Sequence, residues 1–156
     1  MKKLLILTLF VCAASLMSFT TSNQSFEWKT WNNGFPLAKE DGKIALIDTY
    51  TAWCGWCKKM DRDTYEDPTI ISKINKDFVP IKFNPELPGE YNLGDTVVDG
   101  RTLLAALSRG QHSGYPTTFF YLPAKNQMLK YPGYMDAAKF GALLDQLVQY
   151  NNASAN

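Results

Sequence analysis

Two cysteines stand three positions apart in the stretch TAWCGWCKKM, residues 51–60, and each of them follows a tryptophan. Such a pair can hold a metal, close a structural disulfide or exchange electrons with other thiols. A tetrahedral zinc site needs four Cys, His or carboxylate ligands, usually as two pairs, and the chain has one such pair and one histidine, His112. A covalent c-type haem needs histidine directly after the second cysteine, where Lys58 stands. We therefore expect neither a metal nor another cofactor.

A structural disulfide explains the pair poorly. Closing so short a ring between Cys54 and Cys57 would stabilise the fold by only about 1–2 kcal/mol or less, because the entropic gain grows with loop length. A thiol attacks a disulfide only as the thiolate, and a helix that begins at or near Cys54 would present free N–H groups and its positive end to that sulfur. Cys54 is therefore the predicted nucleophile. Cys57, one turn further along, is the predicted resolving thiol, which attacks the Cys54 sulfur and releases the captured substrate.

The segment before the pair contributes an acid in an apolar setting. The run KIALIDTYT is rich in apolar and β-branched residues, which is typical of a buried strand, and Asp48 is its misfit. Burial would raise the pKa of this carboxyl toward the range where it can accept a proton at neutral pH. A buried Cys57 thiol needs such an acceptor before it can attack. Asp48 is thus a candidate base, and the alternative is an acid at the exposed end of the strand.

Helix and strand signals surround this segment on both sides. A short amphipathic helix precedes the strand and ends at Gly42, where glycine allows a left-handed cap. After the cysteine helix, Asp67 and Pro68 are typical of an N-cap followed by proline at the first helical position, so a second helix begins there. The next strand is FVPIKFN, residues 78–84, and Pro80 places it at a sheet edge or at a strand start.

The second half of the chain completes an alternating pattern. Residues 85–100 are rich in proline and glycine and are predicted as a loop, followed by a short helix in TLLAALSR. A strand begins after Pro116, a turn leads into a second strand in QMLKY, and Asp136 caps a final helix. The core-facing stripe of that helix comprises Phe140, Leu143, Leu144, Leu147 and Val148. Strands separated by helices, then a hairpin and a closing helix, predict a single α/β domain with a mixed central sheet flanked by helices.

The first 22 residues have the layout of a secretory signal peptide. Lys2 and Lys3 precede an apolar run of about 14 residues, and a small polar stretch follows. Because a membrane-spanning helix needs roughly 20 apolar residues, a retained anchor is the weaker interpretation. Cleavage would also remove Cys12 and leave Cys54 and Cys57 as the only cysteines. We expect a soluble, periplasmic or secreted protein with one domain over residues 23–151 and a disordered tail at 152–156.

The charge balance argues against nucleic acid as a partner. Loss of residues 1–22 would remove two of the 16 basic residues and none of the 15 acidic ones, leaving 14 against 15 and a formal net charge of −1. Nucleic-acid binding usually requires a strongly basic face. The predicted partners are therefore proteins.

Together, the stretches DTYTAWCGWCKKM and GYPTTFFY resemble the thioredoxin-fold family. Asp48 stands six residues before the first cysteine, where thioredoxins carry a buried acid, and Lys82 lies in a strand that matches the one beside that acid. Tyr115 and Pro116 match the cis-proline loop that faces the cysteines, and Gly133 matches the glycine after the final strand. The resemblance implies a thioredoxin fold and a thiol-disulfide oxidoreductase. Within that family, the sequence is similar to secreted thioredoxin-like reductases and to the C-terminal periplasmic domain of membrane-embedded disulfide transporters.

The resemblance also assigns expected roles to the residues around the cysteines. A cis Pro116 would present the backbone of Tyr115 to an extended substrate, which could pair with it. Lys82 would either pair with Asp48 and temper its pKa or stand as a plain surface lysine. His112 lies in a loop near the site, where it is either solvated or in contact with substrate.

The residues between and before the cysteines are expected to contact substrate. Trp53, Gly55 and Trp56 would form an apolar collar around an exposed sulfur, and ordinary packing is the alternative, more so for Trp53 than for Trp56. The sequence departs from ordinary thioredoxins in two places: Trp56 replaces their proline, and the segment 84–116 is longer than theirs.

The direction of electron flow follows from the same two positions. Strong oxidants owe their potential to an over-stabilised thiolate, and Gly55 and Trp56 supply no charge that would stabilise one. We therefore expect a disulfide reductase that acts on client proteins and is recharged by a thiol-disulfide donor in the membrane. An oxidase or isomerase, and a non-catalytic peptide-binding module on the same scaffold, remain as alternatives.

Overall fold

The computed structural model describes residues 25–111 and 114–153. In chain order, the elements are α1 (Trp31–Asp41), β1 (Ile44–Thr49), α2 (Gly55–Asp63), α3 (Pro68–Asp77), β2 (Phe78–Phe83), β3 (Tyr91–Leu93), β4 (Thr96–Val98), α4 (Gly100–Ser108), β5 (Thr117–Leu122), the 3-10 helix η1 (Pro123–Lys125), β6 (Gln127–Pro132) and α5 (Ala137–Asn152). Each helix and strand predicted from the sequence within this range is present. The residues predicted as a signal peptide, and His112, lie outside the described residues.

A four-stranded mixed sheet, in the order β2-β1-β5-β6, forms the middle layer. The strand β1 pairs in parallel with β2 and antiparallel with β5, and β5 pairs antiparallel with β6. Proline has no N–H to donate to a neighbouring strand. Because β2 lies at the edge of the sheet, no full strand lies on its open side to need such a bond from Pro80. On that open side a single bridge forms, in which the Lys29 N–H donates to Pro80 O at 2.8 Å and the Lys82 N–H donates to Lys29 O at 3.0 Å.

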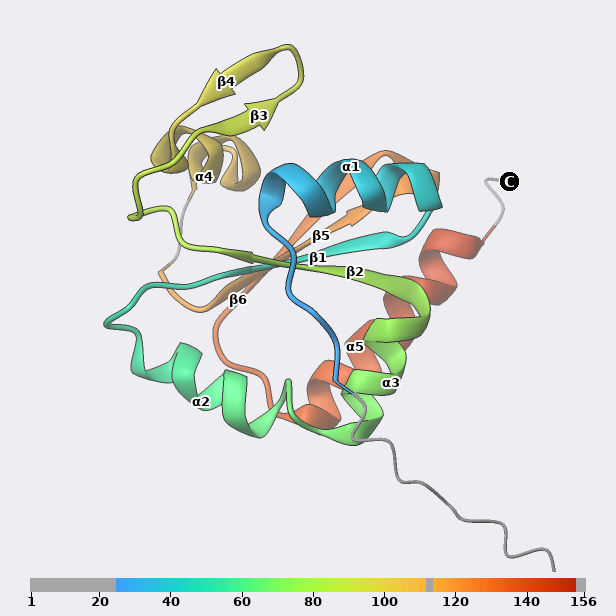
Figure 1. Cartoon of the computed structure of the whole chain (residues 1–156). Coiled ribbons are helices and arrows are strands. Elements are labelled where there is room, and N and C mark those ends of the chain that lie inside the picture. The colour runs from blue at the N-terminus through green and yellow to red at the C-terminus, as the bar shows by residue number, and fades with distance from the viewer. Residues whose placement is uncertain (1–24, 112–113, 154–156) are drawn as a thin grey trace, which may run out of the picture.

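Helices cover both faces of the sheet, and β1 contributes to both cores. Because successive side chains of a strand point to opposite faces, Ile44 and Leu46 belong to the core formed with α2, α3 and α5, whereas Ala45 and Ile47 belong to the core formed with α1 and α4. Figure 1 shows these two groups of helices above and below the sheet. By the same alternation, Asp48 lies on the face of β1 that is covered by α2, α3 and α5.

The ends of the helices are fixed largely where the sequence signals predict. Gly42 follows α1 with φ +66°, and the carboxylate of Asp67 accepts the Thr69 and Ile70 N–H groups at the start of α3. The end of α5 differs from the expectation, since the helix runs to Asn152 and therefore enters the segment predicted as a disordered tail. Asn151 is buried there and accepts a hydrogen bond from the Ala124 N–H at 3.2 Å, which ties the last turn to η1.

The segment predicted as a loop at residues 85–100 contains a hairpin, β3–β4, that the sequence analysis missed. Its strands have three residues each, too short for an apolar periodicity, and Gly94 takes φ +60° in the two-residue turn between them. An isolated two-stranded ribbon is marginal in water. Here α1 holds it: Trp31 Nε1 donates to Asn92 O at 2.7 Å, and Asn32 Oδ1 accepts the Asn92 N–H at 2.9 Å.

No helix among the described residues is both long and apolar enough to cross a membrane.

Candidate active site

The two cysteines lie at the start of α2. Cys54 is the N-cap residue and Cys57 lies in the first turn, and their sulfurs form a disulfide. The chain reaches this position through a turn in which the Cys54 N–H donates to Thr51 O at 3.2 Å. The Cys57 N–H in turn donates to Cys54 Sγ at 3.1 Å. An N-cap side chain that accepts such a bond lies at the positive end of the helix, so negative charge is stabilised at Cys54 rather than at Cys57.

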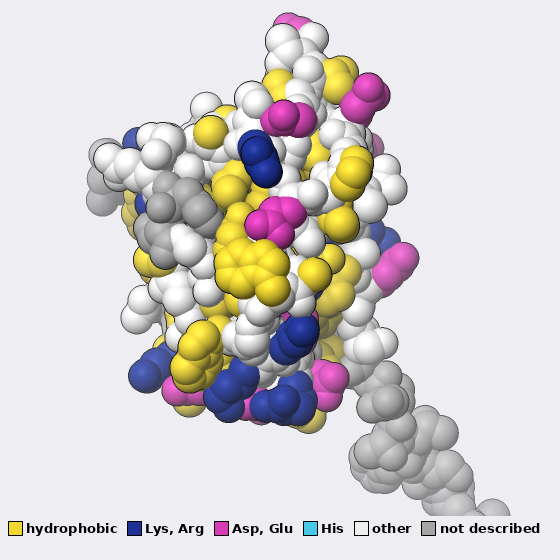
Figure 2. Space-filling view, turned by 90° about the vertical axis from the view of Figure 1, so that its left-hand side faces the viewer, with side chains coloured by type: hydrophobic (Ala, Val, Ile, Leu, Met, Phe, Trp, Pro, Cys, Tyr) yellow, Lys and Arg dark blue, Asp and Glu magenta, His cyan; other side chains and the backbone are white. Residues whose placement is uncertain are grey.

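Exposure does not separate the two cysteines. Cys54 is 4% exposed and Cys57 is 3% exposed, so the expectation of an openly exposed Cys54 sulfur is wrong. The residues around them are open: Trp53 is 68% exposed and Trp56 is 59% exposed, and Gly55 faces open space. Figure 2 shows this end of the molecule, with hydrophobic side chains gathered in the middle of the face. The disulfide therefore lies just beneath an exposed aromatic surface.

Both tryptophans have aromatic neighbours that fix the edges of this surface. The ring of Trp53 meets Tyr115 edge-on, with 5.9 Å between centroids, and its Nε1 donates to Glu86 Oε2 at 2.9 Å. The ring of Trp56 lies 5.4 Å from that of Tyr134. Burial by ordinary packing, the preferred alternative for Trp53, is excluded by its exposure. Both rings remain accessible to a partner.

The proline loop emerges from the sheet beside the cysteine turn. The Tyr115–Pro116 peptide bond is cis, as the resemblance implies. Thr117, the next residue, pairs with Thr49 at the end of β1, and the Thr49 hydroxyl donates to Thr117 O at 2.5 Å. Because the chain passes from Thr49 to the cysteines within five residues, both loops lie at one end of the sheet. Gly133 closes this end from β6, and its N–H donates to Pro116 O at 2.8 Å.

Asp48 and Lys82 form the charged pair beneath α2. Asp48 is 1% exposed, which excludes an acid at the exposed end of the strand. The two residues are neighbours across β1 and β2, and Lys82 Nζ donates to Asp48 Oδ2 at 2.6 Å. Lys82 is therefore a partner of the buried acid and not a plain surface lysine.

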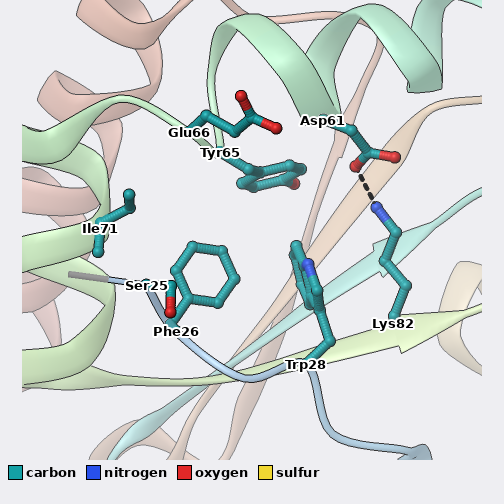
Figure 3. Close-up of a pocket in the computed structure, with 8 residues that line it drawn as sticks. All are labelled: Ser25, Phe26, Trp28, Asp61, Tyr65, Glu66, Ile71 and Lys82. Atoms are coloured by element: carbon teal, nitrogen blue, oxygen red, sulfur yellow. Dashed lines mark hydrogen bonds and ion pairs between the residues drawn. The ribbon is translucent and has the colours of Figure 1, made fainter. Parts of the chain in front are cut away.

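A third residue, Asp61 on α2, completes this cluster and was missed by the sequence analysis. Its carboxylate also accepts a hydrogen bond from Lys82 Nζ, so the lysine bridges a buried and a half-exposed carboxylate. Figure 3 shows Asp61 reaching from α2 to Lys82 on β2. The signal was present in the sequence, because Cys54, Cys57 and Asp61 are spaced i, i+3, i+7 and lie on one side of a helix.

Aromatic rings surround the bridging lysine. Lys82 Nζ lies 4.6 Å from the centroid of Trp28, 5.1 Å from Tyr50 and 5.3 Å from Tyr65. A cavity of about 630 Å³ opens beside Lys82, with Trp28 and Tyr65 in its walls (Figure 3). The ammonium group is thus held by two carboxylates and three ring faces, while one side of the cluster adjoins the cavity.

The electrostatics of the cluster raise the pKa of Asp48. Burial raises the pKa of Asp48, the nearby Lys82 offsets only part of this, and the charge of Asp61 raises it again. Burial alone would lower the pKa of Lys82, but the two carboxylates outweigh it and hold that pKa above its ordinary value. Burial and the charge of Asp48 raise the pKa of Tyr65 well above its ordinary range. Lys82 therefore stays charged while Asp48 is poised to exchange a proton.

Three buried polar atoms next to this pair have no hydrogen-bond partner at ordinary length and angle among the described residues, although Tyr65 lies close enough to interact with both Asp48 and Thr118. They are Asp48 Oδ1, the Thr118 hydroxyl and the Tyr65 hydroxyl. Thr118 is the direct partner of Asp48 across β1 and β5. Native proteins rarely leave buried polar groups unpaired, and a free carboxylate oxygen keeps a lone pair available for a proton. This is the property that the candidate base requires.

These features define the class of the protein. A mixed sheet with helices on both faces, a Cys-x-x-Cys pair at a helix start and a cis-proline at the same end of the sheet make a single thioredoxin-fold domain. The family model described as "Thioredox_DsbH: Protein of unknown function, DUF255" matches residues 11–150, and the chain belongs to that family.

Known proteins and structures agree with this class. The chain is 30% identical over 118 residues to the thiol:disulfide interchange protein DsbD of Salmonella paratyphi A, covering 69% of this chain and 17% of that protein. The chain thus spans less than a fifth of this curated relative. A thioredoxin from Thermus thermophilus superposes with a TM-score of 0.66 at 20% identity, covering 83% of this chain and 92% of that one. A DsbH oxidoreductase superposes with a TM-score of 0.58 at 15% identity, covering 96% and 95%.

Proposed function

We propose that the protein is a thiol-disulfide oxidoreductase that reduces disulfides in extracytoplasmic proteins. The observation that carries the thiol-disulfide chemistry is the hydrogen bond from the Cys57 N–H to Cys54 Sγ at the N-cap of α2. The direction of electron flow rests on Gly55 and Trp56, which supply no charge that would over-stabilise a thiolate. The hydrogen bond to Cys54 Sγ supports Cys54 as the sulfur that carries the negative charge in the reduced protein, and the thiolate is the attacking species. The name of the Salmonella relative, a thiol:disulfide interchange protein, supports the same chemistry.

The reaction consists of two exchanges. The Cys54 thiolate attacks one sulfur of a client disulfide, forms a mixed disulfide and expels the other client sulfur as a thiolate. Cys57 then attacks Cys54 Sγ and expels the second client sulfur, which leaves the client with two thiols and the protein with the Cys54–Cys57 disulfide. Two electrons pass to the client, and a thiol-disulfide donor in the membrane returns two electrons to the protein.

Asp48 serves the second exchange. Cys57 is buried and must lose its proton before it can attack, and Asp48 is a buried carboxyl whose pKa is raised by that burial. A carboxyl with a raised pKa is a better proton acceptor at neutral pH than an ordinary one. Lys82, held between Asp48 and Asp61, steadies the negative charge that appears on Asp48 between turnovers.

Clients bind at the exposed surface around the disulfide. Trp53 and Trp56 contribute apolar contact area, and the backbone of Tyr115 beside Pro116 pairs with an extended client segment. A role outside the cytoplasm rests on the predicted signal peptide at residues 1–22, with residues 23–151 as the mature domain.

Insulin reduction, driven by dithiothreitol, tests the activity. The wild-type protein should accelerate it, Cys54→Ser should abolish the acceleration, and Cys57→Ser should accumulate a mixed disulfide with insulin. If Cys54→Ser leaves the rate unchanged, the protein is a binding module rather than an enzyme. The direction is tested by equilibration with glutathione, because a reduction potential near the roughly −120 mV of strong oxidants would contradict a reductase.

A further inference from the structure

A second hollow lies within residues 84–116, the segment that is longer than in ordinary thioredoxins. A pocket of about 210 Å³ is formed between α4 and the segment that precedes β3. Leu104 and Ser108, which are 8% and 4% exposed, line it from α4 together with Ala105, and Pro85 and Tyr115 line it from the other elements. Its volume is below the range of about 300–1,000 Å³ that is usual for small-molecule sites, so it suits one side chain.

The pocket and the disulfide share their rim. Tyr115 lines the pocket and directly precedes Pro116, while its ring contacts Trp53, the residue before Cys54. Glu86 also lines the pocket and accepts the hydrogen bond from Trp53 Nε1. Tyr115 and Glu86 therefore connect the pocket to the residue that precedes Cys54.

The walls of the pocket are built in and do not depend on a partner. A Cβ at Gly100 would lie 2.7 Å from Pro85 O, so the start of α4 packs directly on the segment that forms the opposite wall. The carboxylate of Asp99 caps α4 by accepting the Thr102 N–H at 2.7 Å. These contacts fix α4 against Pro85 and keep the pocket open in the free protein.

Beyond this pocket the groove becomes acidic. A neighbouring hollow of about 300 Å³ shares Pro85, Glu86 and Arg101 with it and is further lined by Asp99. Residues 85–99 carry four acidic side chains and no lysine or arginine, and all four acids are exposed. Arg101 is the one basic residue that lines both hollows. Figure 2 shows acidic side chains on the upper part of this face, above the central hydrophobic surface.

We propose that this groove, which we call the α4 groove, selects the client segment that flanks the attacked cysteine. In an extended chain, residues two apart project to the same face, about 6–7 Å from each other. The residue two positions from the client cysteine therefore points toward the protein as the cysteine does, and an aliphatic side chain there fills the pocket. A lysine or arginine farther out lies over the acids of residues 85–99. This inference rests on the proposed function, since it assumes that Cys54 engages a client cysteine.

Peptide disulfides of graded sequence test the selection. The symmetrical disulfide of acetyl-Leu-Ala-Cys-Ala-Leu-amide, the leucine peptide, is compared with that of acetyl-Ser-Ala-Cys-Ala-Ser-amide, the serine peptide. Hydroxyethyl disulfide serves as a substrate without side chains. The leucine peptide should be reduced with kcat/KM at least about tenfold above the serine peptide, the range expected for an apolar side chain in a fitted pocket. Equal values for the two peptides would overturn the proposal.

Two variants on α4 locate the effect. Ala105→Phe places a ring in the pocket, whereas Ala106→Phe places the same ring on the next exposed residue, which does not line the pocket. Ala105→Phe should abolish the preference for the leucine peptide and leave hydroxyethyl disulfide reduction unchanged, and Ala106→Phe should keep the preference. Loss of the preference in both variants, or in neither, would contradict the assignment.

The acidic part is tested by charge and salt. Extending the leucine peptide with lysine at both ends should raise kcat/KM relative to extension with glutamate, and the difference should vanish near 1 M salt, where the Debye length is about 3 Å. A preference for glutamate would contradict the acidic groove.

Binding of a peptide that has no cysteine, and so cannot react, separates this inference from the proposed function. In the oxidised protein, the leucine peptide with serine in place of cysteine should shift the amide NMR signals of Leu104, Ala105 and Tyr115, and Ala105→Phe should remove these shifts. If the shifts appear but no disulfide is reduced, the groove stands and the reductase proposal fails. If reduction occurs without them, the groove is wrong and the reductase proposal stands.

Discussion

The cysteine turn and the first turns of α2 have an outer side and an inner side with opposite properties. The outer side presents Trp53 and Trp56, both mostly exposed, whereas the inner side faces Asp48 and Lys82 through Asp61. The cysteines lie between these sides and are about equally buried. The comparison teaches that hydrogen bonding and charge, rather than exposure, distinguish Cys54, the proposed nucleophile, from Cys57.

Each side also places different demands on stability. The outer side leaves large aromatic side chains in water, which costs little because they are supported by neighbouring rings. The inner side places a carboxyl where burial opposes its charge, next to polar atoms without partners at ordinary length and angle among the described residues. Such an arrangement costs stability and is kept where it serves a reaction. The inner side should therefore govern rates and pH dependence, and the outer side should govern substrate affinity.

The largest expected effect separates the two exchanges on the inner side. Asp48→Asn should slow the release of a client from its mixed disulfide about 10²–10⁴-fold at pH 7, the usual contribution of a positioned base. The first attack by Cys54, followed in the Cys57→Ser background, should change much less. Asp63→Asn is the matched control, because Asp63 lies on α2 but pairs with Lys59 and Arg62. Equal slowing of both exchanges would remove Asp48 from its role as base.

The same variant should change stability with a defined sign. Folding raises the pKa of Asp48 above its unfolded value of about 3.9. The protonated group therefore contributes its full stability below that unfolded pKa. This contribution is lost as the pH rises through the folded pKa. Ionised Asp48 therefore destabilises the fold at neutral pH. Asp48→Asn should be more stable than the wild type at pH 7, by about 1.4 kcal/mol for each unit of pKa shift. Urea unfolding of the oxidised proteins measures the free energy of unfolding of the variant and of the wild type at pH 4 and at pH 7. The advantage of the variant over the wild type should be larger at pH 7, and a smaller advantage at pH 7 would contradict the prediction.

A smaller effect is expected at Asp61. Its charge raises the pKa of Asp48 and its carboxylate shares Lys82, so Asp61→Asn should lower the pKa of Asp48 on both counts. The acidic limb of the pH profile for client release should then move to lower pH, and Asp63→Asn should leave it in place. The profile is measured by stopped-flow tryptophan fluorescence. No shift, or a shift to higher pH, would contradict this coupling between Asp61 and Asp48.

The smallest effect is expected on the outer side. Trp56→Ala should raise KM for protein disulfides several-fold while the pH profile of client release stays unchanged, because Trp56 lies on the proposed client surface and not in the inner cluster. The free energy of unfolding should change by no more than about 0.5 kcal/mol, as is usual for exposed positions. A moved pH profile would mean that the two sides of α2 are not independent.

Much of this arrangement was predictable because it depends on local signals. The cysteine spacing, Asp48 in an apolar strand and the caps at Gly42 and Asp67 act within a few residues of the chain, and the structure has them as predicted. The proline at position 116 needed the family resemblance, since an isolated X-Pro bond is usually trans.

The rest depends on contacts between distant segments. The i, i+3, i+7 spacing places Asp61 on the side of α2 that carries the cysteines, but only the packing of α2 on β2 brings it to Lys82, 21 residues away. The β3–β4 hairpin is fixed by side chains of α1 about 60 residues earlier in the chain. The burial of Cys54 likewise depends on neighbours from several loops. No periodicity in the sequence reports such contacts.

Limited alkylation tests most directly which sulfur carries the reaction. The fully reduced protein is treated at pH 7 with less than one equivalent of iodoacetamide, and the label is located by peptide mapping. The account predicts that Cys54 is labelled first and faster than free cysteine, while Cys57 is protected despite its equal burial in the oxidised protein. Labelling of Cys57 first, or of both at the rate of free cysteine, would contradict it.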